Sequence, residues 1–182
     1  MKSKTLFLDR DGVINSLILD NNQLPRSPRH SRELNFLPGT SAALTLAKDK
    51  GYEIYVVTNQ PDIEKGLISR KESEEINFKI MSEFPQINDI YVCPHTQTSN
   101  CLCRKPKPGL ILNSEIYPEI DFNHAWMVGD RWVDIAAGVS ANLKTILIEN
   151  EFSWVTTTTG IPNENLIAQH NVSNLREAVE II

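Results

Sequence analysis

The chain has 182 residues, which suits a single domain over 1–182 with little left for a second. Hydrophobic residues make up 41% of it, as in a globular protein with a sizeable core. The 18 Lys and Arg are outnumbered by 23 Asp and Glu, and the net charge of -5 argues against nucleic acid as a partner, because phosphate backbones recruit basic surfaces. A small phosphorylated substrate is compatible with this composition, since it needs only a local cluster of positive charge.

The start of the chain, MKSKTLFLD, has an uncharged run that is too short for a signal peptide. No apolar stretch reaches the length of a transmembrane helix. We therefore expect a cytoplasmic protein that does not bind membranes, and we expect it to be a monomer.

Five short apolar runs predict β-strands. Most of them are continuously apolar rather than alternating, which is the pattern of strands buried on both faces in a parallel sheet. These runs cover residues 5–9, 53–59, 89–93, 125–130 and 144–149.

Helical patterns lie between the strands. The first is expected to begin at a Thr40 or Ser41 cap and to end at Gly51, and the second opens with Ser69 and Glu72 at the spacing of a capping box. The alternation of strands and helices predicts a doubly wound α/β domain with helices on both faces, which binds ligands beyond the carboxyl ends of its strands. The predicted helices cover 39–51, 69–84, 108–117, 131–138 and 173–182, the last capped at Ser173 or Asn174.

The connection between Asn15 and Pro38 is long for a compact domain, and loops of that length tend to be functional. Its residues 16–28 predict a small hairpin that turns at Asn21 and Asn22. No insertion of the size of a cap domain interrupts the chain, so we expect an open site that the hairpin and a cysteine-rich loop screen. Residues 156–160 are polar and are expected to form a loop.

Polar residues gather where the predicted strands end. In a parallel sheet these ends meet at one edge, so their side chains are expected to lie close together. They are Asp9 and Asp11 after the first strand, Thr58 and Asn59 at the end of the second, Arg104 and Lys105 after the third, and Asp130 with Asp134 after the fourth.

This set of residues suits phosphoryl transfer. Asp9, Asp11 and Asp130 would repel one another without a cation, and carboxylates of this kind suit Mg²⁺. Lys105 and the Thr58 hydroxyl can hold phosphate oxygens. An isolated D-x-D-G is as well explained by a polar turn, but the other three elements in order favour the catalytic interpretation. Asp134 remains a secondary candidate.

The cysteine loop CPHTQTSNCLC predicts a second metal site. Cys93, His95, Cys101 and Cys103 offer three thiolates and an imidazole, the ligand set of a structural Zn²⁺ ion. The alternative is three buried free cysteines beside an unrelated histidine, which the close spacing argues against. A bound ion would clamp this loop and so fix the adjacent Arg104 and Lys105.

FLDRDGVIN, VVTNQ, the lysine of CRKPKPG, and MVGDRWVD together resemble the four motifs of the haloacid dehalogenase (HAD) superfamily of phosphohydrolases. The resemblance spans roughly residues 5–149 and is greatest to the group of heptose 1,7-bisphosphate 7-phosphatases and histidinol-phosphatases. That group combines DRDG and TNQ with a zinc loop that ends in CRKP.

The resemblance implies a role for each matching position. Asp9 would be the nucleophile that becomes an aspartyl-phosphate, and Asp11 the general acid and base. The carboxylates of Asp9 and Asp130 and the backbone carbonyl of Asp11 would hold Mg²⁺. Thr58 and Lys105 would bind the transferred phosphoryl group. The residues in contact with the rest of the substrate would be Asn59, Gln60, Arg104 and Arg131.

We therefore expect a Mg²⁺-dependent phosphomonoesterase, most simply a 7-phosphatase of a heptose bisphosphate. Histidinol phosphate is an alternative substrate, and a non-catalytic zinc-stabilised binding module is an alternative of another class. The sequence departs from the heptose phosphatase pattern in PDIEKG after TNQ, where the better-known members have serine and glycine, in a shorter zinc loop, and in Arg131, where lysine is common. These departures leave the identity of the substrate open. The basic stretch with Arg26, Arg29 and His30 leaves it open too, because it either reaches a second anionic group of the substrate or is a solvated loop.

Overall fold

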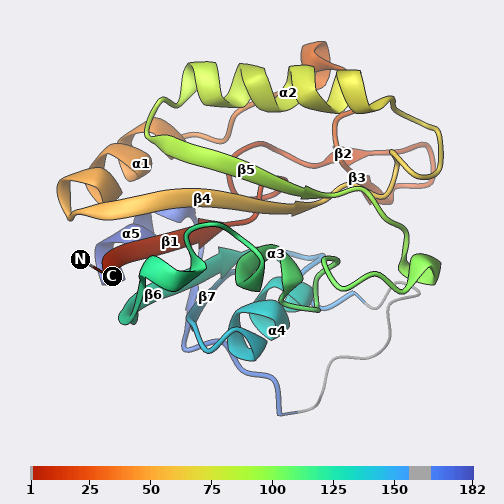
Figure 1. The fold of residues 1–182 in the computed structure, drawn as a ribbon. Helices are drawn as coiled ribbons and strands as arrows, with labels where there is room; N and C mark the ends of the chain where they lie inside the picture. The colour runs from red at the N-terminus through yellow and green to blue at the C-terminus, as the bar shows by residue number, and fades with distance from the viewer. Residues whose placement is uncertain (1, 156–164) are drawn as a thin grey trace.

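The structure is a computed structural model that describes residues 2–155 and 165–182 of the chain. Its main sheet has six parallel strands in the order β5-β4-β1-β6-β7-β8 (Figure 1). The strands are β1 (Ser3–Leu8), β4 (Tyr52–Asn59), β5 (Ile87–Cys93), β6 (Ile120–Gly129), β7 (Lys144–Ile148) and β8 (His170–Val172), and a separate hairpin consists of β2 (Ile18–Leu19) and β3 (Pro25–Arg26). The helices are α1 (Thr40–Asp49), α2 (Arg70–Glu83), α3 (Gly109–Leu112), α4 (Trp132–Ser140) and α5 (Leu175–Ile181), with 3-10 turns η1 (Ser31–Glu33), η2 (Gln97–Ser99) and η3 (Tyr117–Glu119).

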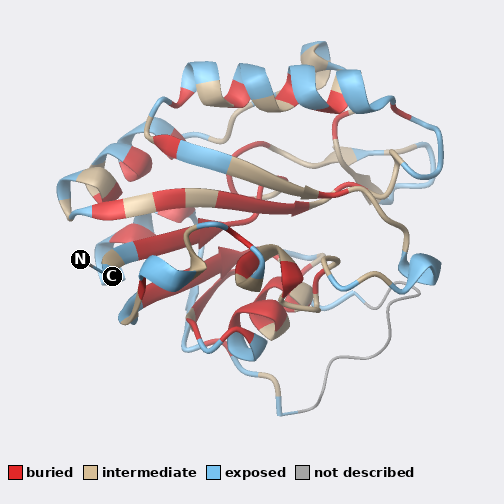
Figure 2. Ribbon diagram, in the orientation of Figure 1, coloured by how far each residue is buried: buried red, intermediate tan, exposed pale blue. Residues whose placement is uncertain are grey.

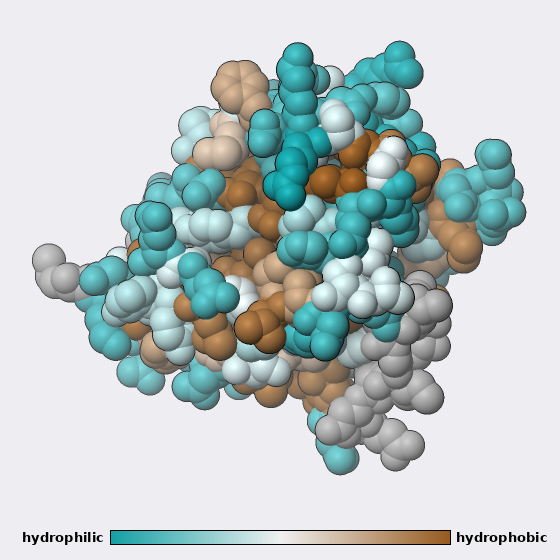
Figure 3. Space-filling model, turned by 45° about the vertical axis from the view of Figure 1, so that its right-hand side comes forward, coloured by the Kyte–Doolittle hydropathy of each residue, from teal (hydrophilic) through white to brown (hydrophobic). Residues whose placement is uncertain are grey.

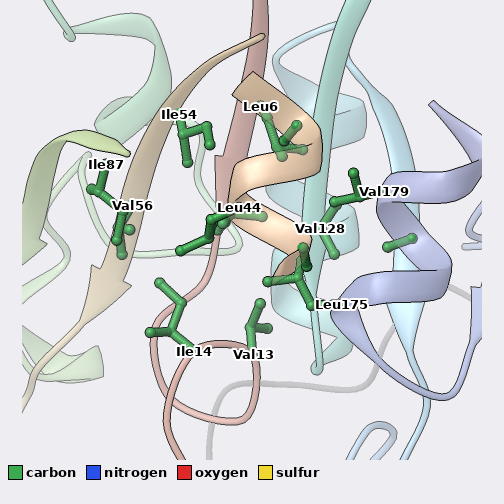
Figure 4. Close-up of a cluster of buried hydrophobic side chains, with 14 of the residues drawn as sticks. Leu6, Val13, Ile14, Leu44, Ile54, Val56, Ile87, Val128, Leu175 and Val179 are labelled. Carbon is green, nitrogen blue, oxygen red and sulfur yellow. The ribbon is translucent and has the colours of Figure 1, made fainter. Parts of the chain in front are cut away.

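Helices cover both faces of the sheet, as the doubly wound pattern predicted. Successive residues of β1 point to opposite faces, so Leu6 and Leu8 pack with α1, α2 and α5, whereas Phe7 packs on the other face near α3. Figure 4 shows Leu6 in the first of these clusters, together with Leu44 of α1 and Val179 of α5. The central strands are buried along most of their length (Figure 2), which explains their continuously apolar sequence.

All five predicted strands are confirmed, and two details differ. β6 begins at Ile120 rather than at residue 125, and β8 forms a sixth strand that no apolar run indicated. β8 has only three residues, of which His170 and Asn171 are exposed, so its sequence carries no strand pattern.

The capping box of α2 is confirmed. The Ser69 hydroxyl oxygen accepts a hydrogen bond from the backbone N–H of Glu72 at 3.1 Å, and the Glu72 carboxylate accepts one from the N–H of Ser69 at 2.8 Å. The last helix is capped by Asn174, whose side chain accepts from the N–H of Glu177. Gly51 follows α1 with a φ of 85°, as predicted for its stop.

The predicted cap of α1 was wrong. Gly39 is the N-cap, with a φ of 81°, and Thr40 is the first helical residue. The Thr40 hydroxyl instead donates to the carbonyl of Leu37 at 2.9 Å, so it is not available to cap the helix.

The predicted helix over 108–117 was also too long. α3 ends at Leu112, and a turn leads to η3. Asn113 and Ser114 follow α3, and the Ser114 hydroxyl donates to the carbonyl of Ile111 at 2.5 Å. Short polar side chains of this kind compete with the helical hydrogen bonds of the backbone, and so they favour an end to the helix here.

The predicted hairpin is confirmed. β2 and β3 pair antiparallel, and the N–H of Gln23 donates to the carbonyl of Asp20 across the turn at Asn21 and Asn22. The Asp20 carboxylate braces the turn through the N–H groups of Asn22 and Leu24. The loop predicted at 156–160 lies outside the described residues. No helix in the described part of the chain is long and apolar enough to cross a membrane.

Candidate active site

A cleft of about 610 Å³ lies beyond the carboxyl ends of β1, β4 and β6. The hairpin forms one wall and the loop after β5 another, so the expected open, doubly screened site is present. Figure 3 turns this side of the molecule towards the viewer, and hydrophilic side chains there surround smaller hydrophobic patches. The residues that line the cleft include Asp9, Asp11, Thr58, Asn59, Gln60, Arg104, Lys105, Asp130, Arg131 and Asp134.

Lys105 and Asp9 form the centre of the cleft. Asp9 directly follows β1, and its N–H donates to the carbonyl of Val128 in β6. The Lys105 ammonium lies 2.7 Å from Asp9 Oδ1 and 2.6 Å from Asp134 Oδ1, and it donates to the carbonyl of Val57 at 2.6 Å. With 2% of its surface exposed, Lys105 holds its charge inside the protein because two carboxylates and a carbonyl surround it.

Three carboxylates, those of Asp9, Asp130 and Asp134, place oxygens within 4.8 Å of one another. Burial raises the pKa of Asp9 to about 7, against the opposing effect of Lys105. Burial and the neighbouring Asp9 raise the pKa of Asp130 as well. Asp130 Oδ1 is buried without a hydrogen-bond partner among the described residues. A single ammonium, that of Lys105, therefore faces three carboxylates, and their hard oxygen atoms fit a divalent ion such as Mg²⁺.

Asp134 belongs to this cluster, although the sequence indicated it only as a secondary candidate. It is fully buried, and its Oδ2 accepts the backbone N–H of Arg131 at 3.0 Å, so the same side chain begins α4 and pairs with Lys105. Asn150 was missed. Its side-chain amide donates to Asp130 Oδ2 at 3.1 Å, and it was detectable because it follows a parallel strand, β7, at the same edge of the sheet.

Gly12 allows Asp130 to reach the cluster. Its φ is 92°, and a Cβ at this position would lie 2.2 Å from Asp130 Oδ2. The glycine of DRDG therefore provides both a backbone conformation that other residues avoid and the space for a carboxylate from β6.

The Asp11 side chain is held away from the three-carboxylate cluster. It accepts five hydrogen bonds: two from Arg10 and one each from Asn15, Ser27 and Gln60. Burial would raise the pKa of Asp11, but the Arg10 charge and these donors outweigh it and lower the pKa. A contribution of Asp11 to a bound ion would thus come from its backbone carbonyl, as the resemblance implied.

The end of β4 supplies Thr58 and Asn59, and Gln60 follows. Gln60 donates from one amide nitrogen to both Asp11 and Thr58 at 2.8 Å. Asn59 accepts from the N–H of Lys105 and donates to its carbonyl, so its amide fixes the backbone that carries the lysine. Asn59 thus has a positioning role that the sequence did not indicate.

The arginines of the cleft fall into two classes. Arg26 and Arg29 are paired with Glu33 and Asp62, at 3.0 and 2.7 Å. Arg104 and Arg131 each donate to a backbone carbonyl, and the Nε of each is buried without a partner among the described residues. Arg104 lies on the loop after β5 and Arg131 at the start of α4, and neither forms an ion pair with a carboxylate among the described residues.

The cysteine loop brings its four candidate ligands together. The Sγ atoms of Cys93, Cys101 and Cys103 and Nδ1 of His95 are separated by 3.2–3.7 Å in the five closest pairs. Zn–S bonds of about 2.3 Å require tetrahedral edges of about 3.8 Å, so the cluster fits a zinc ion after a slight expansion. The sulfurs are too far apart for disulfides, and burial raises the pKa of Cys93, which a bound cation would reverse.

Comparisons with known proteins identify the family of this chain. A family model described as HAD-hydrolase-like matches residues 102–178. A D-glycero-beta-D-manno-heptose-1,7-bisphosphate 7-phosphatase of Helicobacter pylori is 34% identical over 164 residues, which cover 84% of this chain and 91% of the relative. This chain belongs to the HAD family of hydrolases.

Other members of the HAD family agree with this assignment. A D-glycero-alpha-D-manno-heptose-1,7-bisphosphate 7-phosphatase of Campylobacter jejuni is 31% identical, over 83% of this chain and 85% of its own length. The solved structure of a D,D-heptose 1,7-bisphosphate phosphatase from B. bronchiseptica, complexed with magnesium and phosphate, matches with a TM-score of 0.80 and 25% identity, over 100% of this chain and 97% of that one. The chain is accordingly an enzyme of the phosphatase branch of the HAD family.

Proposed function

We propose that this HAD hydrolase is a Mg²⁺-dependent phosphatase that removes one phosphate from a heptose bisphosphate, at the 7-position, through an aspartyl-phosphate. The observation that carries the proposal is the Asp9–Lys105 pair at 2.7 Å beside two further buried carboxylates. The names of the relatives support the substrate class.

Asp9 is the proposed nucleophile. Its carboxylate lies at the mouth of a buried strand, and attack on phosphorus forms the phosphoaspartate while the bond to the leaving oxygen breaks. Lys105 holds an oxygen of the transferred group, together with the Thr58 hydroxyl. When bound by Asp9, Asp130 and the carbonyl of Asp11, Mg²⁺ would neutralise charge on the phosphoryl oxygens.

Asp11 is the proposed acid and base. In the structure it is a carboxylate, which is the form that takes a proton from the water that hydrolyses the phosphoaspartate. Protonation of the leaving oxygen needs the acid form. We propose that the negative charge of the bound substrate raises the pKa of Asp11 and so supplies that form.

Arg104 and Arg131 are the proposed contacts for the second phosphate of the substrate. They are the cleft arginines without a carboxylate partner among the described residues, and guanidinium groups bind phosphate oxygens bidentately. Asn59 and Gln60 are the other proposed substrate contacts, although the amides of both already bond within the protein.

We also propose that Cys93, His95, Cys101 and Cys103 hold a structural Zn²⁺ ion, which fixes Arg104 and Lys105. The thiol cluster suits a reducing compartment, and we propose a monomer in the cytoplasm that acts on a small phosphorylated substrate, without nucleic acid or membrane as a partner.

A panel of phosphomonoesters assayed with Mg²⁺ tests the function. It includes both anomers of heptose 1,7-bisphosphate, because the named relatives differ in the anomer, and histidinol phosphate as the competing substrate. We expect the highest kcat/KM with one heptose anomer and no detectable turnover by Asp9→Asn. A preference for histidinol phosphate would make that compound the substrate in place of the heptose bisphosphate. Inactivity on the whole panel would contradict the phosphatase assignment.

A further inference from the structure

Two segments hold the Asp11 carboxylate from either side. The hairpin segment, residues 16–37, contributes Ser27, whose hydroxyl donates to Asp11 Oδ2 at 2.7 Å. The loop between β4 and α2, residues 60–69, contributes Gln60, whose amide donates to the same oxygen at 2.8 Å. Two residues further along each segment, Arg29 and Asp62 form an ion pair. We call these four residues the clasp: Ser27, Arg29, Gln60 and Asp62.

The outer pair of the clasp is well defined. Arg29 places both Nε and Nη2 on Asp62 Oδ2, at 2.8 and 2.7 Å. The Asp62 side chain is 13% exposed and that of Arg29 is 33% exposed, so water screens the pair only in part.

Both ends of the pair are fixed to their own segments. Glu33 accepts the N–H of Arg29 at 2.7 Å and pairs with Arg26, which holds Arg29 within the hairpin segment. The carbonyl of Asp62 accepts the N–H of Leu67 at 2.9 Å, which holds Asp62 within its loop. The ion pair therefore joins two braced segments rather than two free side chains.

The ion pair adds to the contacts that hold the hairpin segment, among them the hydrogen bond from Lys79 to the carbonyl of Ser31. The strands β2 and β3 of this segment have two residues each, and an isolated hairpin of this size is marginally stable. Ser27 directly follows β3, so its contact with Asp11 depends on the position of the hairpin.

Asp62 lies in PDIEKG, the stretch in which the sequence departs from the related phosphatases it resembles. A glycine at this position would offer no carboxylate to Arg29.

We infer that Asp62 is a positioning residue: through Arg29 it docks the hairpin segment and holds Ser27 on the Asp11 carboxylate. The inference rests on the proposed role of Asp11 in the reaction. Asp62 does not touch the reacting atoms, so its removal should lower kcat more than it changes KM.

The test compares Asp62→Asn, Ser27→Ala and the double variant with the wild-type enzyme. We expect Asp62→Asn to lower kcat about tenfold with KM changed less than about threefold, because small misplacements of a catalytic group cost up to about 100-fold. If Asp62 acts through Ser27, the double variant is no slower than Ser27→Ala. Lys65→Met is the matched control, since it removes the other cation on Asp62 and leaves the Arg29 pair intact; we expect kcat within about twofold of wild type.

Hydrogen exchange provides a readout that does not depend on turnover. Asp62→Asn should speed the exchange of amides that dock the hairpin segment, such as the N–H of Leu37 on the carbonyl of Ile14. Unchanged exchange, an unchanged kcat, or strictly additive losses in the double variant would each overturn the inference. A lower KM for a bisphosphate would also overturn it, because Asp62 would then be withholding Arg29 from the substrate. A wild-type enzyme without phosphatase activity defeats the proposed function, whereas the exchange measurement still decides whether the clasp docks the hairpin.

Discussion

Lys105 shows how a single residue acquires its chemistry from its surroundings. In the sequence it is one of two lysines in CRKPKPG, and its place after the third predicted strand, together with the motif, singled it out. In the structure it is buried between Asp9 and Asp134, with its backbone held by Asn59. Burial alone would lower the pKa of Lys105, but the two carboxylates raise it, so the ammonium stays charged where phosphate is expected to bind.

Replacement of Lys105 tests this arrangement. Lys105→Met should lower kcat/KM by about 100-fold or more, because it removes a charge aimed at the transferred group. Steady-state kinetics on the preferred substrate measures the loss. Lys48→Met, which breaks a surface ion pair with Glu53, is the matched control and should leave kcat/KM unchanged. Equal activity of the two variants would contradict the role of Lys105.

The site residues that belong to sequence motifs were predicted correctly to lie at one edge of the sheet. The side chains that form hydrogen bonds with them were not predicted. Asp9 and Asp130 directly follow parallel strands and Thr58 lies at the end of one, and strand ends can be located from apolar runs. Ser27 reaches Asp11 from a loop whose path depends on tertiary contacts, so no local pattern indicated it. Asn15 lies in FLDRDGVIN, but the motif did not identify it as a donor to Asp11. Asp134 was underestimated because a single aspartate in a helix is usually exposed, and here β6 and Lys105 bury it.

At the scale of elements, the sequence predicted local structure correctly where a side chain forms hydrogen bonds with the backbone beside it. The capping box of α2 was predicted from Ser69 and Glu72 alone, and the turn of the hairpin from Asn21 and Asn22. The start of α1 was missed because Gly39 caps it without a side chain, and β8 was missed because its pairing with β7, rather than its sequence, makes it a strand.

The capping box gives a prediction about stability alone. Ser69→Ala should lower the free energy of unfolding by about 1 kcal/mol, because the N–H of Glu72 loses its partner. Urea denaturation measures this change. Ser69 is exposed and does not line the cleft, so kcat should stay unchanged. A stability equal to that of wild type would show that water replaces the cap.

The cysteine loop gives a prediction about metal. Cys101→Ser should release zinc and lower the activity, because the loop that carries Arg104 and Lys105 loses its clamp. Metal content by mass spectrometry and kcat/KM are measured on the same preparation. Full activity without bound metal would rule out the clamp, since the loop would then hold these residues unaided.

At the scale of the whole molecule, the sheet order places β1 between β4 and β6, so carboxylates and hydroxyls from three strands meet at one edge. This convergence follows from parallel topology, and the sequence was sufficient to predict it. As a result, this edge of the sheet carries a group of buried acids whose negative charge the described residues do not balance. Asp9 illustrates it, because its pKa of about 7 lies far above its usual value of 3.8.

The pKa of Asp9 predicts how magnesium and pH act together. Without metal, the folded protein binds the Asp9 proton more tightly than the unfolded chain, so its contribution to stability is present at low pH and is lost as the pH rises through about 7. Magnesium needs the carboxylate and competes with that proton. Its effect on Tm should therefore be larger near pH 8 than near pH 5.5, and it should nearly vanish in Asp130→Asn. Thermal scans with and without Mg²⁺ measure both, and an equal shift at the two pH values would contradict the coupling.

The close approach of Gly12 to Asp130 has a consequence for reading related sequences. Substitution of Gly12 by alanine would push the Asp130 carboxylate out of its place, although alanine removes no metal ligand. A relative that keeps every aspartate and the lysine but has a side chain at this position would carry a complete set of catalytic residues around a broken centre. An inventory of reactive residues thus identifies an active member of this family only when the glycine between them is also present.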